Sequence, residues 1–202
     1  MRPRTLARVP TTTLYLVRHG EQAHGAADGD DPGAVLTPTG RRQADALGRR
    51  LSGVRLDALR HGPLPRAAQT AAVLATHLPG VPVEASDLLQ DRTPIPAGAT
   101  VEALPPRYRA FLDTVPAEER DEGAARLSAA VAELTAVGPA DRAELLVTHT
   151  FVIGWFVRHV LDAPDWRWLG LNHAHCGLTT IAVTDDGRPP LLLGYNDVGH
   201  LP

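Results

Sequence analysis

The stretch LYLVRHGEQ, residues 14–22, places an arginine and a histidine directly after a run of strand-forming apolar residues. Leu14 to Val17 form a continuous apolar run rather than an alternating one, which is typical of a strand covered on both faces. This strand carries Arg18 and His19 to the point where the chain leaves the sheet. Other side chains decide whether the pair belongs to a solvated strand end or to a functional site.

Helix and strand patterns alternate along the rest of the chain. The predicted helices are 36–51, 63–78, 122–134 and 151–161. The predicted strands are 13–18, 55–62, 81–85 and 143–149, and a hairpin around Asp186-Gly187 is predicted within 177–195. This alternation predicts an α/β fold, a three-layer sandwich whose mostly parallel central sheet has an antiparallel edge strand.

The chain is expected to form a single domain over residues 13–202, with residues 1–12 as a flexible N-terminal tail. The proline-rich stretch 91–106 has little periodicity and is interpreted as a long loop. The wider segment 91–125 is interpreted as an insertion that forms a lid over one end of the sheet. No apolar run approaches the ~18 residues of a membrane span, and the basic N-terminus lacks the apolar core of a secretory signal. A cytoplasmic location is therefore expected.

The composition excludes several classes of protein. All 20 residues that carry a permanent positive charge are arginine, so neither a Walker-type phosphate loop nor a Schiff-base lysine is present. Cys176 is the single cysteine, which rules out an intrachain disulfide. A cysteine-based phosphatase would need an arginine six positions after its nucleophilic cysteine, and six positions after Cys176 this chain has Ala182. The formal net charge of -3 provides no basic field for nucleic acid or an anionic membrane.

Ionisable side chains follow several strands of the predicted sheet. In an open α/β sheet, ligands bind at the carboxyl ends of the strands. Arg18 and His19 end the first strand, and His149 ends the fourth. Arg66 lies in the first turn of the helix that follows the second strand. Two arginines and two histidines from three strands are the natural complement of a phosphoryl group, because arginine binds its oxygens bidentately.

A phosphoryl group at this edge gives His19 the role of a nucleophile. Attack on phosphorus needs a neutral imidazole, and the two arginines and a charged His149 would lower the pKa of His19. His149 would also donate to a phosphate oxygen and stabilise the transition state. Asp91, at the start of the proline-rich stretch, is the best candidate for the acid that protonates the leaving alcohol. The competing acids are Glu102, Glu118, Glu119 and Glu122.

Four sequence blocks occur in a characteristic order: LYLVRHGEQ, LTPTGRRQA, GPLPRAAQTA and LLVTHT. With these blocks the chain resembles the histidine phosphatase superfamily, also called phosphoglycerate mutase-like, from about residue 13 to 198. The later blocks SDLLQDRTPIP and WLGLNHAHCGLT look most like the mitochondrial Ser/Thr protein phosphatase branch. The resemblance implies a phosphoglycerate mutase-like fold and a metal-independent phosphomonoester hydrolase that acts through a phosphohistidine.

The resemblance also implies roles for single residues. His19 would be the phosphorylated nucleophile, and Arg18, Arg66 and His149 would form the phosphate pocket. The acid/base carboxylate would stand at Asp91, where the branch usually has glutamate. Two further departures are His61-Gly62, where the second-arginine block usually begins with serines, and Thr150, where glycine, asparagine or alanine usually follows the histidine.

Two other functions stay open, and several partners are expected or excluded. The alternatives are phosphoglycerate mutase-type phosphoryl transfer and a non-catalytic module that binds phosphate or a phosphoprotein. No cofactor is implied, and His173 with His175 supplies only two ligands of the several that a metal site needs. The expected partner is a phosphorylated substrate, a small metabolite or a phosphoprotein, and neither nucleic acid nor a membrane. The edge hairpin and the apolar segment 151–157 permit a homodimer.

Overall fold

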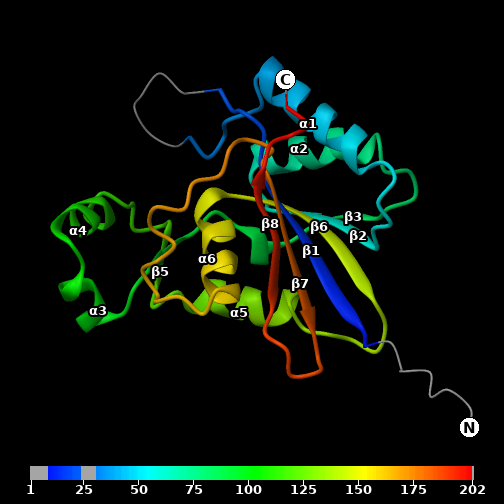
Figure 1. Ribbon diagram of the computed structural model, residues 1–202. Coiled ribbons are helices and arrows are strands. Elements are labelled where there is room, and N and C mark those ends of the chain that lie inside the picture. The colour runs from blue at the N-terminus through cyan, green and yellow to red at the C-terminus, as the bar shows by residue number, and fades with distance from the viewer. Residues whose placement is uncertain (1–8, 24–30, 202) are drawn as a thin grey trace, which may run out of the picture.

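The computed structural model describes residues 9–23 and 31–201, and its centre is a six-stranded sheet in the order β3-β2-β6-β1-β7-β8 (Figure 1). The strands are β1 (Thr11–Arg18), β2 (Ala58–His61), β3 (Val83–Ala85), β6 (Arg142–Thr148), β7 (Leu178–Thr184) and β8 (Leu191–Asp197). The first four in spatial order are parallel, β7 is antiparallel to β1, and β8 is antiparallel to β7. The predicted α/β sheet with its C-terminal hairpin is confirmed. Of the predicted tail, residues 11 and 12 belong to β1, and residues 1–8 lie outside the described part.

Two long helices pack on each face of the sheet (Figure 1). They are α1 (Pro38–Leu51) and α2 (Pro65–Ala75) on one face, and α5 (Ala125–Leu134) and α6 (Thr150–Val160) on the other. β1 contributes to both cores, because Val17 packs with α1 and α2 whereas Leu14 and Leu16 pack with α5 and α6. Each such side chain contributes about 1.5–3 kcal/mol when fully buried. The apolar run of β1 is therefore continuous because helices cover the strand on both faces, as the sequence predicted.

The parallel pairing brings the carboxyl ends of three strands to the same edge of the sheet. β1 pairs with β6 so that Arg18 lies opposite Thr148. β2 pairs with the other side of β6, with His61 opposite Val147. The residues that follow Arg18 and Thr148 therefore leave the sheet side by side.

Residues 91–125 contain short regular elements, two of which lie in 91–106, where the sequence predicted a long loop. β4 (Thr93–Ile95) and β5 (Arg120–Glu122) pair in parallel as a second sheet. Between them lie α3 (Gly98–Ala103) and α4 (Pro106–Asp113), and a 3₁₀ turn, η1 (Asp87–Leu89), precedes them. The loop interpretation was wrong because elements of three to eight residues are too short to show a sequence period. Their buried side chains, including Leu104 and Leu112, join the core beside α5 and α6.

The two apolar segments that could form an interface differ in exposure. In the apolar segment 151–157 of α6, residues 152–157 are buried in the core and Phe151 is partly exposed. β8 is the edge of the sheet, and Leu191, Leu193 and Tyr195 are exposed on it. No helix in the described residues combines the length and apolar character needed to cross a bilayer.

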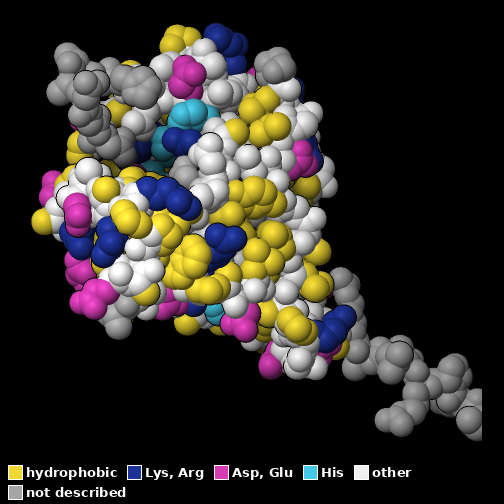
Figure 2. Space-filling model, turned by 60° about the vertical axis from the view of Figure 1, so that its left-hand side comes forward, with side chains coloured by type: hydrophobic (Ala, Val, Ile, Leu, Met, Phe, Trp, Pro, Cys, Tyr) yellow, Lys and Arg dark blue, Asp and Glu magenta, His cyan; other side chains and the backbone are white. Residues whose placement is uncertain are grey.

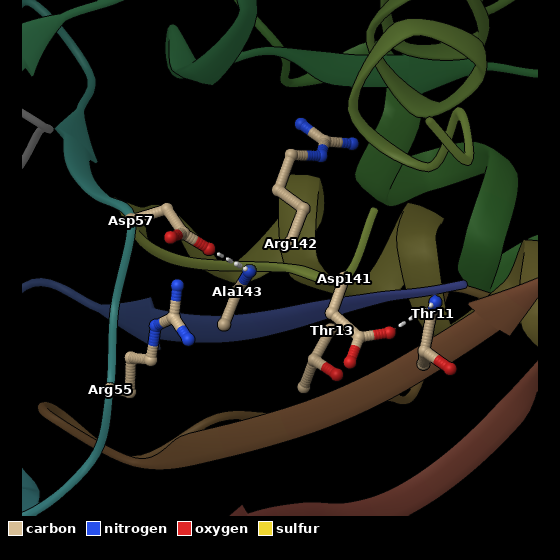
Figure 3. A pocket seen from close by; sticks show the side chains of 7 residues that line it. All are labelled: Thr11, Thr13, Arg55, Asp57, Asp141, Arg142 and Ala143. Atoms are coloured by element: carbon tan, nitrogen blue, oxygen red, sulfur yellow. Dashed lines mark hydrogen bonds between the residues drawn. The ribbon is translucent and has the colours of Figure 1, made fainter. Parts of the chain in front are cut away.

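The amino ends of the same strands meet at the opposite edge of the sheet (Figure 3). A carboxylate oxygen of Asp141 accepts the N–H of Thr11 at 3.0 Å, and one of Asp57 accepts the N–H of Ala143 at 2.8 Å. Arg142 donates to backbone carbonyl oxygens near the end of α5. These residues line a hollow of about 360 Å³. The charged side chains at this edge therefore hydrogen-bond to the backbone where strands begin.

Candidate active site

The carboxyl edge of the sheet holds the residues that the sequence singled out. One hollow of about 280 Å³ is lined by Arg18, His19, Gln22, Asp91, His149, Thr150, Phe151 and Asn172. Arg66 lies beside it, with only 2% of its side chain exposed and its guanidinium on Asp91. On the face shown in Figure 2, histidine and basic side chains gather in a hollow with hydrophobic side chains below it. All five predicted site residues are therefore brought together.

The backbone holds His19 in one tautomer. Its Nδ1 lies 2.9 Å from the carbonyl oxygen of Gly20. Because a carbonyl oxygen can only accept, Nδ1 carries the hydrogen, and Nε2 of the neutral ring keeps its lone pair. The backbone N–H of His19 donates to the carbonyl of Thr148 at 3.0 Å, which fixes the turn after β1 against β6. Nε2 is therefore the nitrogen of His19 that can attack an electrophile.

Burial is the main reason that His19 is neutral. It lowers the pKa of His19, with help from the charge of His149 and then of Arg66 and Arg18, to about 2, although the bond to Gly20 opposes the shift. The sequence predicted the direction of the shift but attributed it to the neighbouring cations alone. His19 is 4% exposed, because β1 and β6 both end beneath it. The imidazole is thus a free base throughout the physiological pH range.

Both arginines are held in place by the protein. Nη1 of Arg18 donates to the carbonyl oxygen of His173 at 2.7 Å. Nη2 of Arg66 lies 2.7 Å from Oδ2 of Asp91, and Nη1 donates to the carbonyl of Asp31 at 3.3 Å. A guanidinium group fixed in this way loses little conformational freedom when it binds an oxyanion. The pair is suited to binding a phosphoryl group from two sides.

The carboxylate of Asp91 lies against two groups that could otherwise bind an anionic ligand, Arg66 and His149. The same oxygen, Oδ2, that contacts Arg66 lies 3.0 Å from Nδ1 of His149. The rings of His149 and His19 are 5.1 Å apart between centroids. Asp91 therefore bridges two of the groups that the sequence predicted to bind phosphate. A phosphate group that enters must take these contacts over.

The charge state of Asp91 follows from these contacts. Burial alone would raise its pKa, but the charges and hydrogen bonds of His149 and Arg66 hold the pKa below its usual value. Asp91 is therefore ionised in this structure. None of the competing glutamates lines the hollow among the described residues, and Glu122 is exposed and paired with Arg120. Asp91 is the carboxylate that the fold delivers to the site.

Thr70 is a site residue that sequence reasoning missed. It is fully buried on α2, one turn after Arg66. Its hydroxyl donates to the carbonyl of Arg66 at 2.7 Å and accepts the N–H of Gly20 at 3.0 Å. Thr70 thus links the turn that carries His19 to the helix that carries Arg66. In an alanine-rich helix it looked like ordinary packing, and only its helical spacing of four from Arg66 marked it.

Close backbone contacts explain glycines in the recognised sequence blocks. A Cβ on Gly20 would lie 2.6 Å from the carbonyl oxygen of Gly40, so the turn after β1 packs directly on the start of α1. A Cβ on Gly62 would lie 2.4 Å from the carbonyl oxygen of Leu89. The departure from serine at position 62 therefore allows β2 to approach the segment that leads to Asp91.

Other candidate groups stand around the site without forming a metal centre. Nδ1 of His175 donates to the carbonyl oxygen of His19 at 3.1 Å, and the two rings lie 5.4 Å apart between centroids. His173 is fully buried, and burial lowers its pKa to about 4. Burial raises the pKa of Cys176 to about 12, so this thiol is not a nucleophile. In residues 9–23 and 31–201, no group of three or more histidine, cysteine, aspartate or glutamate side chains is arranged to hold a metal ion.

The chain is similar to curated phosphatases over most of its length. It is 30% identical over 199 residues to "Serine/threonine-protein phosphatase PGAM5, mitochondrial" of Mus musculus, an alignment that covers 95% of this chain and 65% of that protein. It is 29% identical over 204 residues to the Pgam5 protein of Caenorhabditis briggsae, with coverage of 93% and 64%. The chain thus spans about 65% of the length of these relatives. The prediction of a cytoplasmic location is wrong by this comparison, because the relatives are named as mitochondrial.

A solved structure and a family model agree with this similarity. Bacillus stearothermophilus YhfR superposes with a TM-score of 0.68 at 24% identity, covering 94% of this chain and 98% of that one. This likeness confirms the predicted fold. The model of the histidine phosphatase superfamily (branch 1) matches residues 14–197. Together with the relatives, this match confirms the resemblance first read from four sequence blocks, and the chain belongs to the histidine phosphatase superfamily.

Proposed function

We propose that this protein is a metal-independent phosphomonoester hydrolase that acts through a phosphohistidine on His19. The observation that carries the proposal is the tautomer of His19. Its Nδ1–H donates to the carbonyl oxygen of Gly20, so Nε2 of the buried neutral ring keeps its lone pair. Membership in a superfamily of phosphatases supports the same activity.

In the first step, Nε2 of His19 attacks phosphorus and the bond to the leaving alcohol oxygen breaks. Arg18, Arg66 and His149 bind the phosphoryl oxygens and stabilise the charge that develops on them. In the structure, Arg66 and His149 both contact the carboxylate of Asp91. The entering phosphate dianion displaces Asp91 from these partners, because it carries more charge and matches both donors.

This displacement prepares Asp91 to act as the acid. Away from Arg66 and His149, and next to a dianion, Asp91 loses the contacts that lower its pKa, so it takes up a proton from solvent. The protonated carboxyl gives this proton to the leaving alkoxide. In the second step, water attacks the phosphohistidine and gives a proton to Asp91, and the bond between Nε2 and phosphorus breaks. The products are the alcohol and inorganic phosphate.

Several finer points belong to the same proposal. The insertion 91–125 acts as a lid within a single domain, supported by Phe111 of α4, whose ring contacts Phe151 in the site.

A mitochondrial protein phosphatase is the role that the names of the curated relatives suggest, and a phosphoprotein substrate accords with it. The net charge of -3 leaves nucleic acid out of the proposal. A homodimer through the exposed edge strand β8 is to be tested by light scattering on the full chain.

The test is hydrolysis of p-nitrophenyl phosphate by the wild type and by His19→Ala. We expect activity in the wild type, a loss of at least about a thousandfold in the variant, and an acid-labile phosphohistidine signal by phosphorus NMR only in the wild type. His159→Ala is the matched control, because His159 is an exposed histidine on α6 outside the site. Activity that survives in His19→Ala would refute the phosphohistidine.

Two other outcomes of this assay identify the rival functions. Added 2,3-bisphosphoglycerate with a sugar-acid acceptor separates hydrolysis from transfer. Phosphoryl transfer to the acceptor at a rate above hydrolysis would indicate a mutase. Binding of inorganic phosphate without turnover of any ester would indicate a non-catalytic module.

A further inference from the structure

An aromatic wall, made of Phe151, Phe111 and Trp168, borders one side of the phosphate pocket. Phe151 lines the hollow two residues after His149, in the first turn of α6. The ring of Trp168 lies 5.0 Å from it between centroids, and that of Phe111 lies 5.8 Å from it, both edge to face. Such pairs fix a ring in place. Phe151 is therefore held by two rings while part of it faces the pocket.

The lid contributes the exposed part of this wall. Phe111 comes from α4 and is 37% exposed, whereas Trp168 is 1% exposed and forms the buried base. An exposed large aromatic side chain next to a site is a surface that an apolar group can cover. A leaving group that extends from the phosphate pocket toward α4 would cover both Phe151 and Phe111.

The polar side of the same hollow lacks the means to bind a second anion. Besides the histidines and Asp91, the described residues that line it are Arg18, Gln22, Thr150, Phe151 and Asn172. Arg18 and the adjacent Arg66 are the cations assigned to the phosphoryl group. A carboxylate on the leaving group, as in a phosphorylated sugar acid, would therefore meet Asp91 and neutral amides instead of a third guanidinium.

From this arrangement we infer that the site selects phosphate monoesters whose alcohol carries an apolar, preferably aromatic, group, with Phe151 and Phe111 as the specificity-determining residues. The inference rests on the proposed function, because it assigns the wall to the leaving group of that reaction. An aromatic contact at the wall adds binding in both the ground state and the transition state. It therefore improves affinity for the whole ester without altering the role of His19.

Binding of phosphonates tests the inference without any turnover. Methylphosphonate and benzylphosphonate carry the same phosphorus head group, and only the second can reach the wall. Calorimetry at pH 8 is expected to give about five- to tenfold tighter binding of benzylphosphonate to the wild type. 3-Phosphonopropionate, which carries a carboxylate, is expected to bind no more tightly than methylphosphonate. Equal affinities for methylphosphonate and benzylphosphonate, or tightest binding of 3-phosphonopropionate, would overturn the inference.

Variants locate the preference at the wall. The readout is the ratio of the two affinities, so a general change in phosphate binding cancels. Phe151→Asn is expected to bring the ratio close to one, and Phe111→Ala to about half its wild-type value. Leu193→Ala removes an exposed apolar side chain from β8 and is expected to keep the wild-type ratio. A wild-type ratio in both phenylalanine variants would contradict the inference.

The proposed function and this inference can fail separately. If the wild type binds benzylphosphonate preferentially but hydrolyses no ester, the hydrolase proposal fails and the wall remains a ligand-binding surface. If the wild type hydrolyses phenyl phosphate and ethanolamine phosphate through His19 but binds both phosphonates equally, the hydrolase stands and the inference fails. Far-UV circular dichroism of each variant separates a changed ratio from a loss of folding, and the wild-type comparison needs no variant.

Discussion

The two edges of one sheet carry similar side chains and use them differently. At the amino edge, Asp57 and Asp141 bind backbone N–H groups at strand starts, and Arg55 is exposed to solvent (Figure 3). At the carboxyl edge, Arg66 and Asp91 pair in a buried site beneath two histidines. The hollow at the amino edge is the larger, about 360 Å³ against about 280 Å³. Size therefore does not distinguish the site, whereas burial of ionisable groups does.

The difference lies in what each group is bound to. A carboxylate on a backbone N–H completes the hydrogen bonding of the fold, so an entering ligand gains nothing by displacing it. A carboxylate between Arg66 and His149 occupies a place that a dianion can take over with stronger interactions. Burial raises the strength of these interactions, because the local dielectric is low. Under the proposed function the carboxyl edge exchanges anions, whereas the carboxylates of the amino edge stabilise the fold.

The largest expected effect comes from removing the buried guanidinium. Arg66→Ala is expected to lower kcat/KM for p-nitrophenyl phosphate by about a thousandfold, because it removes the phosphate contact and leaves Asp91 with one partner fewer. Arg55→Ala, the control at the amino edge, is expected to change kcat/KM by less than about twofold, because this arginine is exposed. Similar losses in both variants would remove the distinction between the two edges.

The next effect separates the roles of Asp91. Asp91→Asn is expected to slow hydrolysis of an alkyl phosphate by about a hundredfold and that of p-nitrophenyl phosphate much less, because nitrophenolate leaves without a proton. The matched substitution at the other edge, Asp57→Asn, is expected to leave both rates nearly unchanged. Kinetics with the two esters measure the difference. Equal slowing of both esters in Asp91→Asn would mean that Asp91 acts on phosphate binding rather than on the leaving group.

The proximity of these residues was predictable because parallel strands translate sequence order into position. Arg18 and His149 follow or end paired strands, so their proximity follows from the register of β1 with β6. The ion pair between Asp91 and Arg66 was not predictable, because it depends on how the segment after η1 returns to the sheet. Thr70 was missed because a threonine in a helix carries no signal of its own until its partner, Gly20, is known.

The fold was predicted less well where elements are short. The long elements β1, α1 and α6 have clear apolar patterns, and Thr37 caps α1 by accepting the N–H of Gly40. In contrast, β4 and β5 have three residues each and form only because they pair with one another. Long-range pairing of this kind leaves no local period. The aromatic wall on Phe151 likewise depends on α4, a helix that the sequence did not predict.

A smaller effect concerns the buried ring of His173 behind Arg18. Its two nitrogens have no hydrogen-bond partner among the described residues, and burial, followed by the charge of Arg18, lowers its pKa from 6.5 to about 4. The unfolded chain therefore binds a proton more readily, so stability is lost as pH falls from 6.5 toward 4 and is unaffected above that window. When the pH falls from 8 to 5, this histidine lowers the free energy of unfolding by about 2 kcal/mol.

His173→Phe tests this assignment. Denaturant unfolding at pH 8 and pH 5 is expected to show a fall in stability that is about 2 kcal/mol smaller in the variant than in the wild type. His159→Ala is the comparison at an exposed position, where burial and the charge of Arg158 also lower the pKa of the histidine. The same pH dependence in His173→Phe and wild type would show that this ring does not titrate on unfolding.

The smallest effect is expected at the amino edge, where it defines the other half of the comparison. Asp57→Ala and Asp141→Ala each remove one carboxylate from a backbone N–H at an exposed strand start. Water can replace the lost acceptor, so each change is expected to cost about 1 kcal/mol of unfolding free energy. Because neither residue touches the carboxyl edge, kcat/KM should stay within about twofold of wild type. Urea unfolding and steady-state kinetics on the same preparations measure both quantities, and a kinetic loss without a stability loss would assign a function to the larger hollow.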